Sequence, residues 1–292
     1  MNTTQLPNWA QSYMKYIQVP IKKPSYEYLA EICKAHLNKI PFENISTLLA
    51  YRDYDRTGWL IPNEEQFVDQ LYKYHMGGTC YSINSNLLSL LKTLGFQCRY
   101  AQLGSIHAGI LVQVPETEES VYVDCGTAAP LFKPLRFETT SRPTSTFGDI
   151  EVVIVPEKEE GVYTFQRYVD KKLIKQTLWT FDTKKDIQFH DFQTAINEYF
   201  EPGTQFMNTL RCQVWQLEKE RSLSLVNNIL SIRKSDGKAE KHKLSSVDEI
   251  QNAVTEEFKL PKLPVKEAAR VLERLGVDIF KEPGKDHRVN LG

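Results

Sequence analysis

The sequence predicts an α+β protein built from three consecutive parts. We expect an N-terminal helical bundle over residues 1–95, a central antiparallel β-barrel over 96–190, and a C-terminal α/β part with a final helix over 191–292. Apolar residues recur at helical spacing up to Gly95, and short β-rich runs bounded by glycine or polar turns follow. A new unit is expected to start near residue 190 and separates two groups of such runs.

Three segments carry the helical pattern of the first part. Residues 24–40, PSYEYLAEICKAHLNKI, have apolar side chains on a helical rhythm and end before Pro41, which cannot continue a helix. Residues 64–74, EEQFVDQLYKY, repeat this pattern, and so does the apolar run that begins at Cys80. With 292 residues, of which 41% are hydrophobic, the chain is long enough to bury a large core.

Short β-rich runs predict the second part. Successive runs joined by short polar connections are expected to pair as antiparallel neighbours, which favours a barrel or a strongly curled sheet. The runs cover residues 98–104, 107–114, 120–126, 150–155, 161–169 and 172–181.

The third part mixes strands with a helix. Strands are expected around residues 211–220, 222–234 and 240–244, with the sequence SDGK as a turn between the last two. A helix should follow them, because Ser246 and Glu249 have the spacing of a capping box.

Charge and cysteine content narrow the class of partner. The 36 basic and 37 acidic residues nearly cancel, which argues against nucleic acid or an anionic membrane and leaves a small molecule as the expected partner. No apolar run approaches the roughly 20 residues that span a bilayer, and the N-terminus lacks the order of a signal peptide, so we expect a cytoplasmic protein. Five cysteines without a CxxC pair predict free thiols and no metal site. The sequence does not determine the oligomeric state.

One cysteine stands in a setting typical of a reactive thiol. Cys80 follows Gly77 and Gly78 and begins an apolar-periodic run. A cysteine at a helix N-terminus lies near the positive end of the helix dipole, which favours the thiolate, and glycines before it leave room for a substrate. The alternative is that Cys80 is a small buried hydrophobic residue, which is the common situation of free cysteine.

A base and an orienting group follow on successive predicted strands. His107 begins one strand and Asp124 ends the next, so the two side chains could project together if the strands are antiparallel neighbours. Each residue alone has a structural explanation, as a hydrogen-bonded histidine at a strand edge and as a turn cap. The order of Gly-Gly-x-Cys on a helix, then His, then Asp resembles a papain-like cysteine-transferase core.

Longer motifs make the resemblance specific. The chain resembles the arylamine N-acetyltransferases, whose segments have the form Arg-Gly-Gly-x-Cys-x-Glu-x-Asn, then a strand His, then Val-Asp-x-Gly. The resemblance extends from about His36 to Phe258. The matching positions are Gly77, Gly78, Cys80, Asn84, His107, Val123, Asp124 and Gly126, preceded by His36 and the run Ile40 to Ile45, and followed by Asp191, Phe192, Asn197, Tyr199 and Phe206.

The resemblance implies a fold and a reaction. The fold is a helical bundle that carries the cysteine, a β-barrel that carries His and Asp, and an α/β lid. The reaction is ping-pong transfer of an acetyl group from acetyl-CoA, through the thiol of Cys80, to an aromatic amine or hydrazine, as in xenobiotic metabolism. Acetyl-CoA is then a substrate, and no permanently bound cofactor is expected. In this scheme Asp124 orients His107, and the His107 imidazolium stabilises the Cys80 thiolate.

Some positions depart from the family pattern. Met76 stands where the family has arginine, and Ser82 where it has glutamate, so a charged pair that could brace the cysteine loop is absent as a whole. After Asp124 the chain continues with Thr127 and Ala128 in place of an aromatic residue and a glycine. These departures bear on the choice of acceptor and on the fit of the donor.

Binding residues are expected around the triad. Because aromatic amines require flat apolar walls, we expect the acceptor site to include Phe42, Tyr81, Thr127, Phe192 and Phe206. Core packing is an equal explanation for these aromatic side chains. Candidate contacts for CoA are Gly126 and Lys133, with Arg136 as a further cation.

Two other functions fit the same residues. One is a thiol acyltransferase or amidase that uses this core with an amide donor. The other is a catalytically impaired paralogue that keeps the fold and binds a ligand, which the departures at Met76, Ser82, Thr127 and Ala128 make conceivable.

Overall fold

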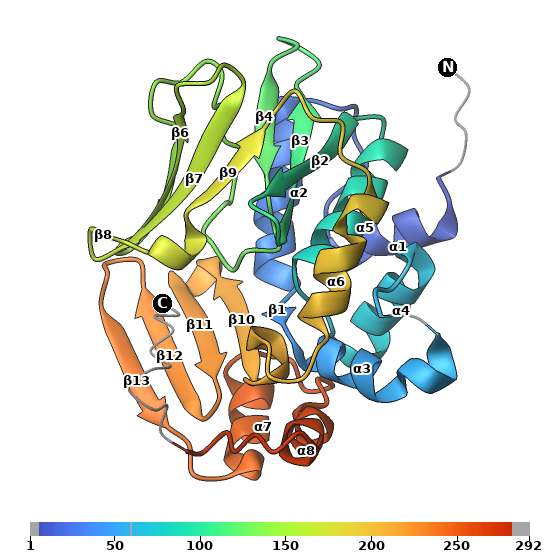
Figure 1. Ribbon diagram of the computed structural model, residues 1–292, viewed down its shortest axis with the longest axis vertical. Coiled ribbons are helices and arrows are strands. Elements are labelled where there is room, and N and C mark those ends of the chain that lie inside the picture. The colour runs from blue at the N-terminus through green and yellow to red at the C-terminus, as the bar shows by residue number, and fades with distance from the viewer. Residues whose placement is uncertain (1–5, 59, 282–292) are drawn as a thin grey trace.

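Five helices form the N-terminal third of the computed structural model, which describes residues 6–58 and 60–281. Ser25 caps the second helix by accepting the Tyr28 N–H, and a capping box at Asn63 and Gln66 begins the fourth. Figure 1 shows four of these helices on the right-hand side of the molecule, while the second runs through its centre, behind a sheet. They are α1 (Asn8–Ile17), α2 (Tyr26–Lys39), α3 (Ile45–Thr57), α4 (Glu64–Tyr74) and α5 (Cys80–Thr93).

The central strands form two antiparallel sheets. The first sheet has the order β2-β3-β4 and packs on α5, and the second has the order β5-β6-β7-β8 with β9 paired to β7. Short 3-10 turns precede and follow β9, namely η1 (Lys175–Thr177) and η2 (Phe189–Phe192). The strands are β2 (Gln97–Leu103), β3 (His107–Gln113), β4 (Ser120–Val123), β5 (Thr144–Phe147), β6 (Ile150–Pro156), β7 (Val162–Val169), β8 (Lys172–Leu173) and β9 (Trp179–Asp182).

The predicted closed barrel is wrong. Within the described residues, the edges of the β2-β3-β4 sheet meet other segments only through isolated bridges, Tyr122 with Leu135 and Tyr100 with Ile187, and through single bonds such as Gly104 N–H to Thr180 O. Closure of a barrel requires a continuous hydrogen-bonded ladder between its first and last strands. The irregular chain over residues 124–143 passes from β4 to β5 without forming that ladder.

The last third contains a sheet and two helices. Its sheet has the order β1-β10-β11-β12-β13, so the short strand β1 (Phe42–Glu43) of the helical part pairs with β10. Asn44 fixes this junction, because its side chain accepts the Arg211 N–H and donates to the carbonyls of Phe206 and Thr209. The other elements are α6 (Gln193–Tyr199), η3 (Gln205–Met207), β10 (Arg211–Gln216), η4 (Leu217–Lys219), β11 (Arg221–Val226), β12 (Ile229–Lys234), β13 (Ala239–Lys243), α7 (Val247–Glu256) and α8 (Val265–Arg274).

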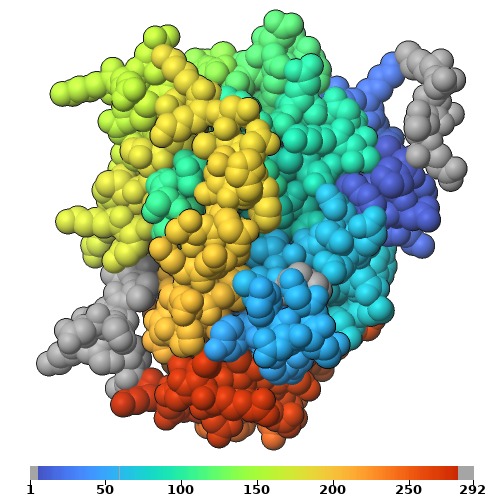
Figure 2. Space-filling view, turned by 45° about the vertical axis from the view of Figure 1, so that its right-hand side comes forward, coloured from blue at the N-terminus to red at the C-terminus, as the bar shows by residue number. Residues whose placement is uncertain are grey.

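Two local predictions for this part are confirmed. Ser246 caps α7 by accepting the Glu249 N–H, although the Glu249 carboxylate accepts from Ser245. The SDGK turn lies between β12 and β13, where Gly237 N–H donates to Lys234 O. Figure 2 shows the segment from about residue 180 to 205 running down one face, between the strands of the second part and the N-terminal helices. The division into three domains stays a prediction.

No helix in the described ranges has the length and apolar character needed to cross a bilayer.

Candidate active site

Cys80 is the first residue of α5, as the sequence predicts. The preceding Thr79 has an extended backbone and is the N-cap, so the N–H groups of the first turn have no helical acceptor. These N–H groups and the helix dipole place a positive field at the thiol. The Cys80 side chain is 6% exposed.

The two glycines before Cys80 are required by packing. A Cβ atom at Gly77 would lie 2.1 Å from the carbonyl oxygen of Pro41, and one at Gly78 would lie 2.8 Å from Ser82 Oγ. Gly78 also has a φ of +110°, which L side chains rarely adopt. The space beside these glycines is therefore filled by protein atoms, rather than being left for a substrate.

His107 and Asp124 meet as the order of the strands predicts. The His107 Nε2–H donates to Asp124 Oδ2 over 2.8 Å. The same oxygen accepts from Tyr122 OH at 2.7 Å, and Oδ1 accepts from Asn84 Nδ2 at 2.7 Å and from Gly126 N–H at 2.8 Å. Four donors thus hold a carboxylate that is 1% exposed, which satisfies a buried charge and fixes its orientation.

The charge on His107 follows from its neighbours. Burial by itself lowers the pKa of His107, but the negative charges of Asp124 and Cys80, with hydrogen bonds to both side chains, raise that pKa to about 10. Because Nε2 bonds to Asp124, Nδ1 is the nitrogen left for Cys80. The arrangement therefore places a positively charged imidazolium beside the Cys80 sulfur, which is the setting of nucleophilic cysteines.

Asn84 connects the three segments that carry these residues. It lies one turn after Cys80 on α5, and its Nδ2 donates both to Asp124 and to the carbonyl of Ala108, the latter over 2.6 Å. Its Oδ1 accepts the Cys125 N–H at 3.0 Å. One amide thereby fixes α5 against β3 and against the chain that follows β4.

Two residues of the site escaped the sequence reasoning. Tyr122, two residues before Asp124, is buried and donates its hydroxyl to the carboxylate. Trp179, at the start of β9, stacks on His107 with ring centroids 4.7 Å apart. Alternation along the strand could have indicated Tyr122, since residues two apart share a face. Nothing in the local pattern pairs Trp179 with a strand so distant in sequence.

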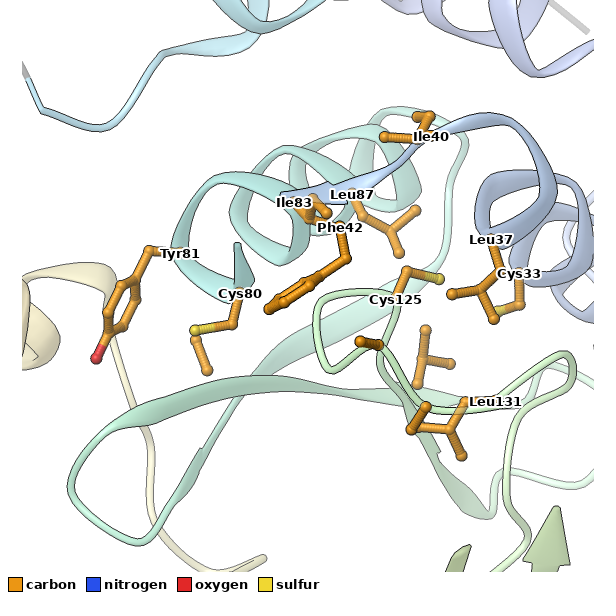
Figure 3. Packing of buried hydrophobic residues seen from close by; sticks show 14 of the residues in the cluster. Cys33, Leu37, Ile40, Phe42, Cys80, Tyr81, Ile83, Leu87, Cys125 and Leu131 are labelled. Atoms are coloured by element: carbon orange, nitrogen blue, oxygen red, sulfur yellow. The ribbon is translucent and has the colours of Figure 1, made fainter. Parts of the chain in front are cut away.

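The candidate aromatic residues form one packed group beside Cys80. The Tyr81 hydroxyl donates to the Ile106 carbonyl at 2.7 Å, and its ring contacts those of Phe192 and Tyr199. Phe192 is fully buried and therefore a core residue in this structure. Phe42 packs edge-on against the half-buried Phe206, and Figure 3 shows the Phe42 ring directed toward Cys80.

The candidate CoA contacts lie in different settings. Gly126 is buried against Cys80, whereas Lys133 is exposed. Arg136 forms an ion pair with Glu119 and lies 3.9 Å from the centre of the Tyr26 ring, so it is engaged within the protein. Thr127 is half-buried, and its Oγ1 accepts the Ala129 N–H at 3.3 Å.

The departures near the cysteine loop are accommodated by packing. Met76 is 5% exposed and belongs to the core, and Ser82 Oγ donates to the Gly77 carbonyl at 3.1 Å. Glu43 is fully buried below this loop, and its Oε1 has no hydrogen-bond partner within the described structure. Burial raises the pKa of Glu43 to about 7.

The remaining cysteines are buried or half-buried thiols. Cys125 lies next to Asp124 but points toward the side of the core that contains Cys33 (Figure 3). Burial raises the pKa of the Cys125 and Cys212 thiols, and that of Cys98 to about 12. Across residues 6–58 and 60–281, no three His, Cys, Asp or Glu side chains are arranged to hold a metal ion.

Comparisons with known proteins agree with this geometry. A family model for N-acetyltransferases matches residues 25–267. The fold is that of solved arylamine N-acetyltransferases. The enzyme from Salmonella typhimurium has 19% sequence identity and a TM-score of 0.74 over 92% of this chain and 100% of that chain. A search of curated protein sequences gave no significant match.

Two mycobacterial structures have the same fold. The enzyme from Mycobacterium marinum, solved in complex with CoA, has 18% identity and a TM-score of 0.69 over 91% of this chain and 98% of that chain. The enzyme from Mycobacterium abscessus has 16% identity and a TM-score of 0.73 over 95% of this chain and 100% of that chain.

Proposed function

The chain belongs to the N-acetyltransferase family and is therefore an acyltransferase, and we propose that it acetylates aromatic amines or hydrazines through an acetyl-Cys80 intermediate. The proposed donor is acetyl-CoA, which the CoA complex of the Mycobacterium marinum enzyme supports. The observation that carries the proposal is the approach of Asp124 and His107 to a cysteine at the N-terminus of α5.

The first half-reaction forms a thioester on the protein. The Cys80 thiolate attacks the carbonyl carbon of acetyl-CoA, and the bond between that carbon and the CoA sulfur breaks. The leaving CoA thiolate takes the proton of the His107 imidazolium, which leaves the imidazole neutral and Cys80 acetylated. Asp124 stabilises the imidazolium before this step, and its four hydrogen bonds keep the carboxylate in place.

Backbone N–H groups can stabilise the oxyanion that forms during this attack. The first-turn N–H groups of α5, at Cys80, Tyr81 and Ser82, have no helical acceptor. In contrast, the N–H groups of Cys125 and Gly126 already donate to Asn84 and Asp124. The first turn of α5 is thus the donor surface that the structure offers to the developing negative charge.

The second half-reaction returns the thiol. The neutral imidazole of His107 accepts a proton from the amine as its nitrogen attacks the acetyl carbon. The bond between that carbon and Cys80 Sγ breaks, so the products are the N-acetylated amine and the thiolate beside an imidazolium. Because CoA leaves before the amine reacts with acetyl-Cys80, the kinetics should be ping-pong.

Mass spectrometry of the protein after incubation with acetyl-CoA tests the first half-reaction. We expect one acetyl group on Cys80, and its loss when an aniline or a hydrazine is added. Cys80→Ser and Cys80→Ala should abolish acetylation and keep the folded state, since serine lacks an accessible anion at neutral pH. Acetyl transfer by the Ala variant would remove Cys80 as the nucleophile.

Other outcomes identify the alternatives. A protein that forms no acetyl-Cys80 but is acylated by an amide donor would be an amidase or another thiol acyltransferase on this core. One that binds CoA or an arylamine without turnover would be a ligand-binding paralogue. A cytoplasmic location and a role in the metabolism of foreign amines are further proposals that follow from the family resemblance.

A further inference from the structure

The indole of Trp179 lies flat on the imidazole of His107. The ring centroids are 4.7 Å apart, and the planes differ by only 11°. His107 is 5% exposed, while Trp179 is half-buried at the start of β9. The two residues come from strands of different sheets, β3 and β9.

The core holds Trp179 in this place. Its cross-strand partner on β7 is Phe165, which is 1% exposed and has its ring centroid 5.7 Å from that of Trp179. Phe165 also contacts the ring of Tyr122, whose hydroxyl donates to Asp124. One buried phenylalanine therefore supports a neighbour of His107 and a neighbour of Asp124.

The backbone fixes the register of β9 against the turn before His107. Gly104 N–H, in the turn between β2 and β3, donates to Thr180 O at 2.8 Å. A Cβ atom at Gly104 would lie 3.6 Å from Trp179 Cδ1, so this turn also touches the indole. The stacking is thus set by a packed junction of two sheets.

The imidazole needs such a support. Its edges are engaged by Asp124 at Nε2 and by Cys80, and these two are the titratable groups that act on it. Tyr122 on β4 donates to the Asp124 carboxylate. A rotation of the ring about its bond to Cβ would break both edge contacts, and a flat aromatic surface against one face opposes that rotation. An indole face also attracts a cation through its π electrons.

We propose that Trp179 is a positioning residue for His107: it holds the plane of the imidazole between Cys80 and Asp124 and stabilises the imidazolium by cation–π contact. Trp179 acts through His107 and does not contact the substrate. The proposal rests on the proposed function only because it assumes that His107 acts on Cys80. Trp179 belongs to the second sheet, and none of the motifs that contain Cys80, His107 and Asp124 includes it.

Two substitutions separate the proposed role from simple packing. Trp179→Leu keeps an apolar cover over His107, so the desolvation of the imidazole is largely retained while the π face is lost. Trp179→Phe keeps a smaller π face. Leu178→Ala changes a neighbouring side chain that is 45% exposed and is the matched control.

The measured quantity is the rate of Cys80 acetylation by acetyl-CoA in single turnovers across pH. We expect Trp179→Leu to lower this rate about tenfold at neutral pH and to move the alkaline limb of the profile down by about one pH unit. The acid limb of the profile should not move, because His107 is protonated at pH values both below and above that limb. Trp179→Phe should recover most of the rate, and Leu178→Ala should match the wild type.

Iodoacetamide alkylation of Cys80 in the same variants makes the result independent of acetyl transfer. If the wild type is not acetylated, the proposed function fails, and the high-pH transition in the alkylation profile still reports on His107. An unmoved alkaline transition in Trp179→Leu, or a rate loss that Trp179→Phe does not recover although both variants unfold at the wild-type temperature, would overturn the positioning role.

Discussion

Gly126 lies so close to Cys80 that a Cβ atom on Gly126 would be 2.6 Å from Cys80 Cα. The same Cβ would come within 3.0 Å of Asn84 Nδ2, which donates to Asp124. Because the first contact is with backbone, no rotation of a side chain can relieve it. The glycine after the triad carboxylate is therefore required by the approach of the Asp124 segment to α5.

Gly126→Ala should displace the start of α5 from His107. We expect overpacking to destabilise the protein by about 1–3 kcal/mol and to slow alkylation of Cys80 at neutral pH. Urea unfolding and iodoacetamide labelling measure the two effects. Gly203→Ala is the control, since nothing lies within 4 Å of its Cβ, although its φ of +88° costs about 1–2 kcal/mol. Unchanged Cys80 labelling in Gly126→Ala would contradict the packing argument.

Selective labelling should distinguish Cys80 from the other thiols. Burial raises the pKa of Cys125 and Cys212, and that of Cys98 to about 12, so these groups stay protonated at pH 6, whereas Cys80 lies beside His107, whose pKa is raised to about 10. We expect iodoacetamide at pH 6 to modify Cys80 much faster than Cys33, Cys98, Cys125 or Cys212, as measured by peptide mass spectrometry. The substitution His107→Gln should slow the alkylation of Cys80. Equal rates for all five cysteines would exclude an activated thiolate.

Glu43→Gln should remove a pH-dependent loss of stability. Burial raises the pKa of Glu43 from 4.5 to about 7, so between these values the unfolded chain releases a proton that the folded chain keeps. Stability contributed by the protonated carboxyl is therefore lost as pH rises through this window. At pH 8 the glutamine variant should be more stable than the wild type by at most about 3 kcal/mol.

Urea unfolding at pH 5 and pH 8 measures the effect of Glu43→Gln. The advantage of the variant should be small at pH 5 and large at pH 8. Glu218→Gln, at an exposed carboxyl, is the control and should show no such difference. An advantage that does not change with pH would mean that Glu43 is not titrating in the folded protein.

Restoring the family residues after Asp124 should change the choice of acceptor. Ala128 has a φ of +56°, a conformation that favours the glycine of the family pattern, so Thr127→Phe with Ala128→Gly fits the backbone. We expect kcat/KM for an aniline to rise more than for a hydrazine, because hydrazines are more nucleophilic and depend less on stacking. Ala128→Gly alone is the control. An equal rise in kcat/KM for both acceptors, or no rise, would show that this segment does not set the choice of acceptor.

The amino-acid order was sufficient for the local features of the site. Glycines, a cysteine at the start of an apolar-periodic run, and His and Asp on successive strands predict the helix start at Cys80 and the contact of His107 with Asp124, and the structure has both. These predictions succeed because each depends on a short-range pattern, either helix capping or the pairing of neighbouring strands. The same is true of the cap at Ser246.

Only the tertiary structure decided how distant segments meet. The prediction of a barrel was wrong because the periodicity of a sequence predicts strands but does not predict which sheet edges pair with each other. Trp179 reaches His107 only through the junction of two sheets, and the buried Oε1 of Glu43 is left unpaired by the packing around it. Contacts of this kind depend on the three-dimensional path of the chain, since packing acts between surfaces that are far apart in sequence, and no local spacing of residues records them.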